Sequence, residues 1–139
     1  IIQIFDSWAG LADNNLIGKF IYDPTAELVD FIKSQKVPVI CFPKDIKDYH
    51  EYIQEVMPSV ISIDYNIDIK NFSQKVKIPV QGNLNPNVLL SDEKNLKDET
   101  LKILDTFKDH PHIFNLGHGV LPQTNPNMVE YLVKLVKNY

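Results

Sequence analysis

The sequence predicts an α/β fold in which parallel strands alternate with helices, and three observations carry this prediction. Five short apolar runs each precede a segment with helical periodicity. Polar residues follow every apolar run, as they do at the carboxyl ends of strands in such folds. The 139 residues are too few for a complete (β/α)8 barrel, which needs about 250. Two architectures therefore fit: part of such a barrel, or a small open doubly wound domain.

We expect the strands at residues 1–5, 37–42, 60–63, 78–82 and 112–116. Each run is rich in β-branched or aromatic residues and has the length of a strand. Pro38 lies near the start of its run, where a missing N–H group is tolerated. Because a helix separates successive strands, the strands are expected to be parallel and joined by right-handed crossovers.

A helix is expected after each strand, and four of the five begin at a capping residue. The expected starts are Asp23 before Pro24, Asp68, Ser91, and Asn125 before Pro126. Each helix should bury one apolar stripe. These stripes are expected to consist of Leu28, Phe31 and Ile32; Ile46, Tyr49, Ile53 and Val56; Ile69, Phe72 and Val76; Leu96, Ile103, Leu104 and Phe107; and Val129, Leu132, Val133 and Val136.

The composition excludes several classes of function. The net charge is −4, and all 14 basic residues are lysine, whereas a nucleic-acid-binding domain presents a basic face. No apolar stretch approaches the 18 or so residues of a membrane helix. Cys41 is the single cysteine and cannot form an internal disulfide, so nothing points to an oxidising compartment. We expect a cytoplasmic protein without nucleic-acid or membrane partners.

The most informative polar segment is 117–119, a histidine between two glycines after the last strand. Glycines there allow unusual backbone angles and a close approach by a ligand. The His118 imidazole can donate to a carboxylate or move a proton near neutral pH. The structural alternative is a loop histidine bonded to neighbouring backbone.

Ser7 follows the first strand and can either donate its hydroxyl to a substrate or serve only in a turn. No G-x-S-x-G motif surrounds it, which excludes the usual hydrolase nucleophile. Asp6, Lys44 and Asp64 also follow strands, where an ion pair at the strand ends is the simplest role, and Asn83 is expected to end its strand.

The other histidines, His50, His110 and His112, are interpreted as surface or packing residues, and Cys41 as a small buried one. No H-x-C or C-x-x-C arrangement supports a zinc site. No G-x-G-x-x-G or Walker loop follows a strand, so a nucleotide site has little support.

Four segments together resemble the uroporphyrinogen decarboxylases. Segment 4–10, IFDSWAG, is similar to that family's F-[DE]-S-x-A-G, and segment 62–65, SIDY, to its G-L-D-W. Segment 80–86, VQGNLNP, resembles Q-G-N-L-D-P, and segment 114–122, FNLGHGVLP, resembles N-L-G-H-G-[IL]-x-P. The segments follow the family's order and cover essentially the whole chain. The departures are conservative at Ser62-Ile63 and at Tyr65, which replaces tryptophan.

The resemblance implies a distorted α/β barrel that acts as a homodimer, without metal or organic cofactor, on uroporphyrinogen III. It also implies that Ser7 and His118 contact the substrate. The family's arginine-rich segment, pyrrole-binding aspartate and active-site tyrosine match nothing here. We therefore expect no catalytic residue in this chain and regard residues 1–139, which begin without Met at the apolar Ile1, as the C-terminal part of one barrel domain, inactive alone.

Two alternatives belong to other classes. A cobalamin-linked methyltransferase of similar fold would use a zinc–thiolate site, which Cys41 alone cannot build. A non-catalytic flavodoxin-like binding module would have an open sheet in which one strand has moved across the first. Strand order distinguishes the module from a barrel, in which neighbouring strands follow the order of the sequence.

Overall fold

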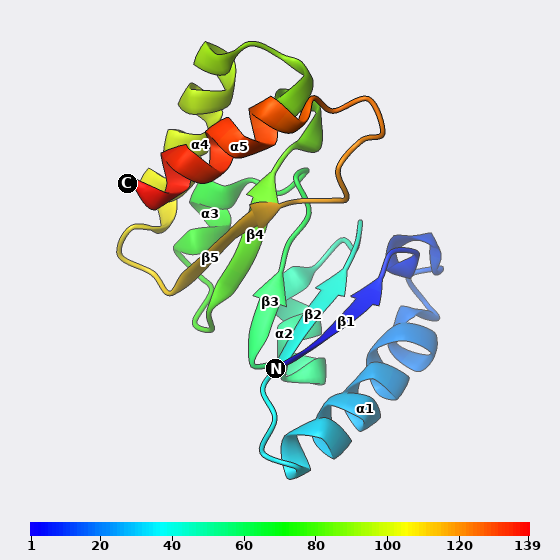
Figure 1. Ribbon diagram of the computed structural model, residues 1–139. Helices are drawn as coiled ribbons and strands as arrows, with labels where there is room; N and C mark the ends of the chain where they lie inside the picture. Colours follow the sequence, from blue (N-terminus) through cyan, green and yellow to red (C-terminus); the bar gives the residue numbers. More distant parts are fainter. The chain divides into compact units, whose positions relative to one another are not determined.

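The computed structural model describes residues 1–139, which fold into five strands that alternate with five α-helices (Figure 1). The chain divides into two compact units, Ile1–Ile63 and Asp64–Tyr139. The first unit holds the strands β1 to β3 and the helices α1 and α2, and the second holds β4, β5 and α3 to α5. None of the helices combines the length and the apolar character needed to cross a membrane.

The strands of the first unit are parallel and follow the order of the sequence. β1 (Ile2–Asp6) pairs with β2 (Val39–Pro43), and β2 pairs with β3 (Val60–Ser62). All the residues of β2 and β3 are buried. Because β2 lies between β1 and β3, this order contradicts the flavodoxin-like alternative, in which β1 would be the middle strand.

Helix α1 (Asp23–Ser34) differs from its prediction at the start and on its buried face. A π-helical turn, η2 (Gly18–Tyr22), runs directly into it, so Asp23 is a helical residue instead of the cap. The buried stripe follows Tyr22, Val29 and Ile32, while Leu28 is 45% and Phe31 66% exposed. Both exposed residues lie about 100° from that stripe on the helix, each one position before a buried residue.

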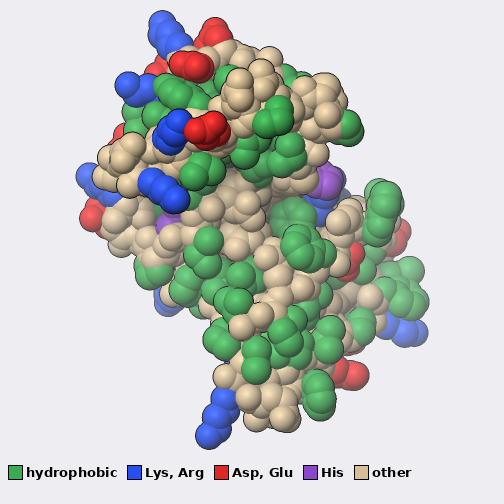
Figure 2. Space-filling model, viewed as in Figure 1, with side chains coloured by type: hydrophobic (Ala, Val, Ile, Leu, Met, Phe, Trp, Pro, Cys, Tyr) green, Lys and Arg blue, Asp and Glu red, His purple; other side chains and the backbone are tan.

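Helix α2 (Tyr49–Val56) begins one turn later than Ile46 suggests. Asp48 caps it by accepting from the backbone N–H groups of His50 and Glu51 at 2.8 and 2.9 Å. Tyr49, Tyr52 and Val56 form its buried face, and Ile46 is buried in the preceding loop. Several large apolar side chains of the first unit remain on the surface, including Phe5, Trp8, Leu11 and Phe20, and Figure 2 shows how extensive the exposed hydrophobic area is.

In the second unit, β4 (Val80–Leu84) and β5 (His112–Leu116) are parallel neighbours, with Val80 opposite His112. Helix α4 (Glu93–Phe107) buries the predicted Leu96, Ile103, Leu104 and Phe107. It packs on both α3 (Ile69–Ser73) and α5 (Pro126–Lys137). This helical layer forms the core of the second unit together with the buried β4.

Two of the predicted caps in this unit are confirmed and one is wrong. Asp68 caps α3 and Asn125 caps α5. Helix α4 is capped by Asp92, whose side chain accepts from Asn95 N at 2.8 Å. The hydroxyl of Ser91 instead donates to the Val88 carbonyl at 2.6 Å and closes the 3-10 turn η3 (Pro86–Leu90).

Candidate active site

The carboxyl ends of β1 and β2 are joined beyond the last strand residues. Lys44 N donates to the Asp6 carbonyl at 3.0 Å, and Gly10 N donates to the Lys44 carbonyl at 2.9 Å. A Cβ atom at Gly10 would lie 2.3 Å from the carbonyl oxygen of Asp45. Gly10 is therefore required for this close backbone contact. Its place in the sequence does not predict this role.

The loop after β1 leaves Ser7 available to a ligand. Asp6 accepts a hydrogen bond from Trp8 N at 3.2 Å, so its carboxylate helps to shape its own loop. The half-buried Ser7 makes no side-chain hydrogen bond, and the neighbouring Trp8 is 74% exposed. The hydroxyl predicted to contact substrate is thus not used by the local turn.

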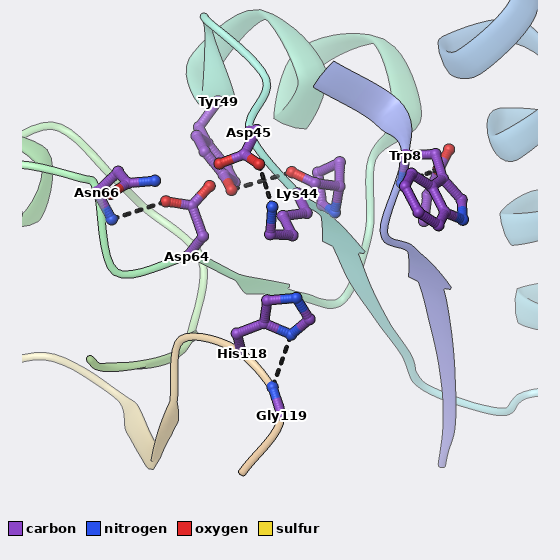
Figure 3. A network of polar contacts seen from close by, with 10 residues as sticks. Trp8, Lys44, Asp45, Tyr49, Asp64, Asn66, His118 and Gly119 are labelled. Carbon is purple, nitrogen blue, oxygen red and sulfur yellow. Dashed lines mark hydrogen bonds and ion pairs between the residues drawn. The ribbon is translucent and has the colours of Figure 1, made fainter. Parts of the chain in front are cut away.

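Lys44 and Asp45 form an ion pair at the carboxyl end of β2, while Tyr49 at the start of α2 donates its hydroxyl to the Pro43 carbonyl at 2.9 Å (Figure 3). The side chain of Lys44 is 18% exposed and that of Asp45 is 43% exposed. The predicted ion pair joined Lys44 to Asp6 or Asp64, whereas the pair found within this unit joins Lys44 to the adjacent Asp45.

In the second unit, Asp64 and Asn83 are linked at the beginning of the chain segment that leads to α3. Asp64 is 1% exposed, and its carboxylate accepts from Asn66 N at 2.8 Å (Figure 3). The amide of Asn83 donates to the Asp64 carbonyl at 2.8 Å. Asn83 does not end its strand as predicted, because β4 continues to Leu84 and buries this side chain.

Gly117 fixes the start of the His118 loop. Its N–H donates to the Leu84 carbonyl at 2.8 Å. A Cβ atom at Gly117 would lie 2.5 Å from Tyr65 N and 2.9 Å from Tyr65 Cα, whereas one at Gly119 would meet nothing within 4 Å. Neither glycine has a left-handed φ, so the conformational freedom that glycine allows is not used for a left-handed turn here. Close packing on Tyr65 explains Gly117.

His118 is exposed, and its Nδ1 atom accepts a hydrogen bond from Gly119 N at 2.7 Å (Figure 3). A neutral imidazole has one acceptor and one donor nitrogen, so this bond places the proton on Nε2. The local backbone contact that stood as the structural alternative is present. It leaves the opposite nitrogen as an outward N–H donor, which suits a carboxylate ligand.

The remaining histidines have packing roles, as predicted for His110 and His112. His110 Nε2 bonds the Ile78 carbonyl at 2.9 Å, and His112 Nε2 bonds the Gly82 carbonyl at 2.7 Å. The His112 ring stacks on Phe107 with centroids 4.5 Å apart. Burial lowers the pKa of His112 more than the Gly82 hydrogen bond raises it, so this ring is neutral at neutral pH.

Cys41 is fully buried, as predicted, and burial raises the pKa of its thiol to about 11. No group of three or more histidine, cysteine, aspartate or glutamate side chains is placed to hold a metal ion.

The structure thus brings Ser7 and Lys44 together in the first unit, and Asp64, Asn83 and the His118 loop together in the second.

Alternating parallel strands and helices with polar groups at the strand ends define part of an α/β-barrel enzyme. The family model for uroporphyrinogen decarboxylase (URO-D) matches residues 1–139. The chain belongs to the uroporphyrinogen decarboxylase family, whose fold is an α/β barrel, and this confirms the predicted fold class. The methyltransferase alternative has a similar fold, and it is the family match that speaks against it.

Individual relatives agree with the family model. The chain is 44% identical over 144 residues to uroporphyrinogen decarboxylase of Orientia tsutsugamushi (strain Ikeda), covering 100% of this chain and 42% of the relative. It is 43% identical to the enzyme of Wolbachia sp. subsp. Brugia malayi (strain TRS), covering 99% and 41%, and 41% identical to that of Rickettsia bellii (strain RML369-C), covering 100% and 42%. The chain therefore spans about two fifths of the length of these curated relatives.

Proposed function

We propose that this chain supplies substrate-binding groups to a carboxy-lyase that converts uroporphyrinogen III to coproporphyrinogen III by removing the carboxyl groups of its four acetate side chains. The family match over residues 1–139 gives the reaction class. The observation that carries the role of this chain is the His118 loop. Gly117 packs against Tyr65. Gly119 N donates a hydrogen bond to Nδ1 of the His118 imidazole, so the N–H group at Nε2 can donate to a substrate carboxylate.

Ser7 is proposed as the second substrate contact. Its hydroxyl has no competing partner, and the loop that carries it is held by the Asp6, Gly10 and Lys44 backbone bonds. A hydroxyl and an imidazole N–H can orient substrate carboxylates without changing their own covalent state. Orientation of this kind lowers the barrier by fixing the reacting group before the reaction begins.

The decarboxylation itself needs groups of another kind. Protonation of a pyrrole ring creates an electron sink, the carboxylate then leaves as CO2, and a carboxylate near the pyrrole N–H groups stabilises the developing cation. We do not assign that role to Asp6 or Asp64, because neither matches the family's pyrrole-binding aspartate; in this chain each accepts a hydrogen bond from a nearby backbone N–H group, of Trp8 and Asn66 respectively. We assign the pyrrole-binding acid to a part of the full protein outside residues 1–139.

For the full protein we propose a cytoplasmic homodimer that acts without a metal or organic cofactor. The support is the family resemblance together with a single buried cysteine, which makes no disulfide within the chain. Analytical ultracentrifugation of the full protein tests the dimer, and metal analysis of active preparations tests whether a metal is needed.

The test of function is coproporphyrinogen formation from uroporphyrinogen III by the full protein, with the porphyrins quantified after oxidation. We expect Ser7→Ala and His118→Ala to raise KM or lower kcat, while Ser73→Ala and His50→Ala, on α3 and α2, remain close to wild type. Residues 1–139 alone should give no turnover. Wild-type kinetics in both site variants would remove Ser7 and His118 from the site.

A further inference from the structure

We propose that Lys44 binds a carboxylate of the substrate beside Ser7, as a further substrate-binding residue. This inference rests on the function proposed above and adds a cationic group to it. The family resemblance assigns no role to Lys44. The proposal comes from the register of β1 and β2, from the face on which the lysine emerges, and from the composition of the chain.

The register places Ser7 and Lys44 side by side. Asp6 lies opposite Pro43 as the last pair of the β1–β2 ladder. The ladder is followed by one more bond, from Lys44 N to the Asp6 carbonyl, so Ser7 and Lys44 are the first residues after the two adjacent strands. Gly10 N binds the Lys44 carbonyl from the other side. The backbone of Lys44 is therefore fixed on both sides, next to the Ser7 loop.

The alternation along the strands gives the face on which the two side chains emerge. The hydroxyl of Tyr52 on α2 lowers the pKa of the Cys41 thiol, against the larger effect of burial, so Cys41 faces the helices. Phe42 points to the opposite face, where its ring meets that of Phe5 at a centroid distance of 6.2 Å. Lys44 follows Phe42 by two residues, and Ser7 follows Phe5 by two. The proposal extends this alternation by one residue past the end of each strand, which places both side chains on the face without helices; in an α/β barrel that face is the inner one.

The composition leaves few other candidates for a cationic carboxylate ligand. The chain has no arginine, and of its 14 basic residues only Lys44 directly follows a strand. Its side chain is mostly buried and ends at the half-exposed carboxylate of Asp45. Because the Asp45 side chain is 43% exposed, the ion pair is open on the Asp45 side. In the proposal a substrate carboxylate reaches the ammonium from that side and lies beside Asp45. The ammonium and the Ser7 hydroxyl then supply two donors to one carboxylate.

The experiment measures turnover of uroporphyrinogen III by the full protein and binding of uroporphyrin III, its stable oxidised analogue, by fluorescence titration. We expect Lys44→Gln to weaken both binding and kcat/KM by about tenfold or more, because a hydrogen bond to a charged group is lost. Lys44→Arg should recover part of the loss. Lys47→Gln removes the same charge from an exposed loop position three residues away and should match wild type.

A double-mutant cycle tests whether the two residues hold the same carboxylate. If they do, Ser7→Ala combined with Lys44→Gln should cost less than the product of the two single effects. Wild-type behaviour of Lys44→Gln, alongside weakened Ser7→Ala and His118→Ala, would overturn the role of Lys44 and leave the proposed function intact. Absence of turnover and binding in the wild-type protein would instead overturn the proposed function itself. Loss of folding in Lys44→Gln is recognised by circular dichroism, and Lys44→Met and Lys44→Arg then decide the question.

Discussion

The two glycines that flank His118 give a sharp test of how its loop is held. Substituting Gly117 by alanine places a Cβ atom 2.5 Å from Tyr65 N, and real Cβ contacts essentially never fall below 3.0 Å. The two backbone segments must therefore separate by at least 0.5 Å. Side chains cannot absorb this movement, because the contacted N and Cα atoms of Tyr65 belong to the backbone. The hydrogen bond from Gly117 N to the Leu84 carbonyl resists the same displacement.

The expected cost of Gly117→Ala follows from overpacking, which typically destabilises a protein by about 1–3 kcal/mol. With two backbone segments in contact we expect the upper half of that range, which lowers Tm by roughly 4–12 °C at about 2–4 °C per kcal/mol. Thermal unfolding of the full protein, followed by circular dichroism, measures this. Because the substitution also displaces the His118 loop, KM for uroporphyrinogen III should rise as well.

Gly119→Ala is the matched control, since its Cβ meets no atom within 4 Å and its N–H to His118 Nδ1 is retained. Its free energy of unfolding should lie within about 0.5 kcal/mol of that of the wild-type protein, as is usual for surface substitutions. Equal stability of the two variants would refute the conclusion that Gly117 packs against the Tyr65 backbone. It would also remove our explanation of why His118 stands where it does.

Three further predictions concern buried groups. Cys41 should resist alkylation at pH 8 until the protein unfolds, because with a pKa of about 11 only about one thiol in a thousand is ionised at that pH. His112 has a lowered pKa, so unfolding takes up a proton and stability falls as the pH drops below about 6.5. His112→Gln should flatten this decline in urea titrations between pH 7 and 5. The hydroxyl of Thr100 is buried without a hydrogen-bond partner, and Thr100→Val should raise the free energy of unfolding by about 1 kcal/mol.

Most of the local structure follows from short-range chemistry and could be predicted. The observed strands begin and end within two residues of the predicted runs, because apolar runs of strand length are a strong signal. Asp68 and Asn125 cap their helices for the expected reason. Ser91 was misassigned because the next residue, Asp92, is an equally good cap. Ser91 instead ends a 3-10 turn that no pattern in the sequence indicates.

The face of α1 shows where the sequence pattern fails. Apolar residues at 28, 29, 31 and 32 are compatible with two stripes one position apart, and the pattern alone cannot choose between them. The choice depends on the π-helical turn before Asp23, which brings Tyr22 onto the buried face. That turn depends on tertiary contacts, including the edge-to-face packing of Tyr22 on Tyr52. The spacing of apolar residues along the sequence does not predict such contacts.

The candidate site was predictable as a list of residues but not as an arrangement. Strand ends identified Ser7, Lys44 and His118, because the carboxyl ends of parallel strands carry the site in this class of fold. Which side chain is available depends on hydrogen bonds that only the structure gives. Asp6 is bound by its own loop whereas Ser7 is not, and Gly119 determines which nitrogen of His118 carries the proton.

The groups at the strand ends divide by chemistry in a way that indicates what this part of the protein contributes. Two carboxylates lie at strand ends, Asp6 as the last residue of β1 and Asp64 shortly after β3, and both accept hydrogen bonds from nearby backbone N–H groups. The groups that we propose as substrate contacts are donors: the hydroxyl of Ser7, Nε2 of His118, and the ammonium of Lys44, which is also paired with Asp45. A site that offers donors binds carboxylates well and moves protons from carbon poorly. The proposed role of this segment is to bind and orient a polycarboxylate, so its substitutions should change the affinity for porphyrinogens more than the pH dependence of turnover.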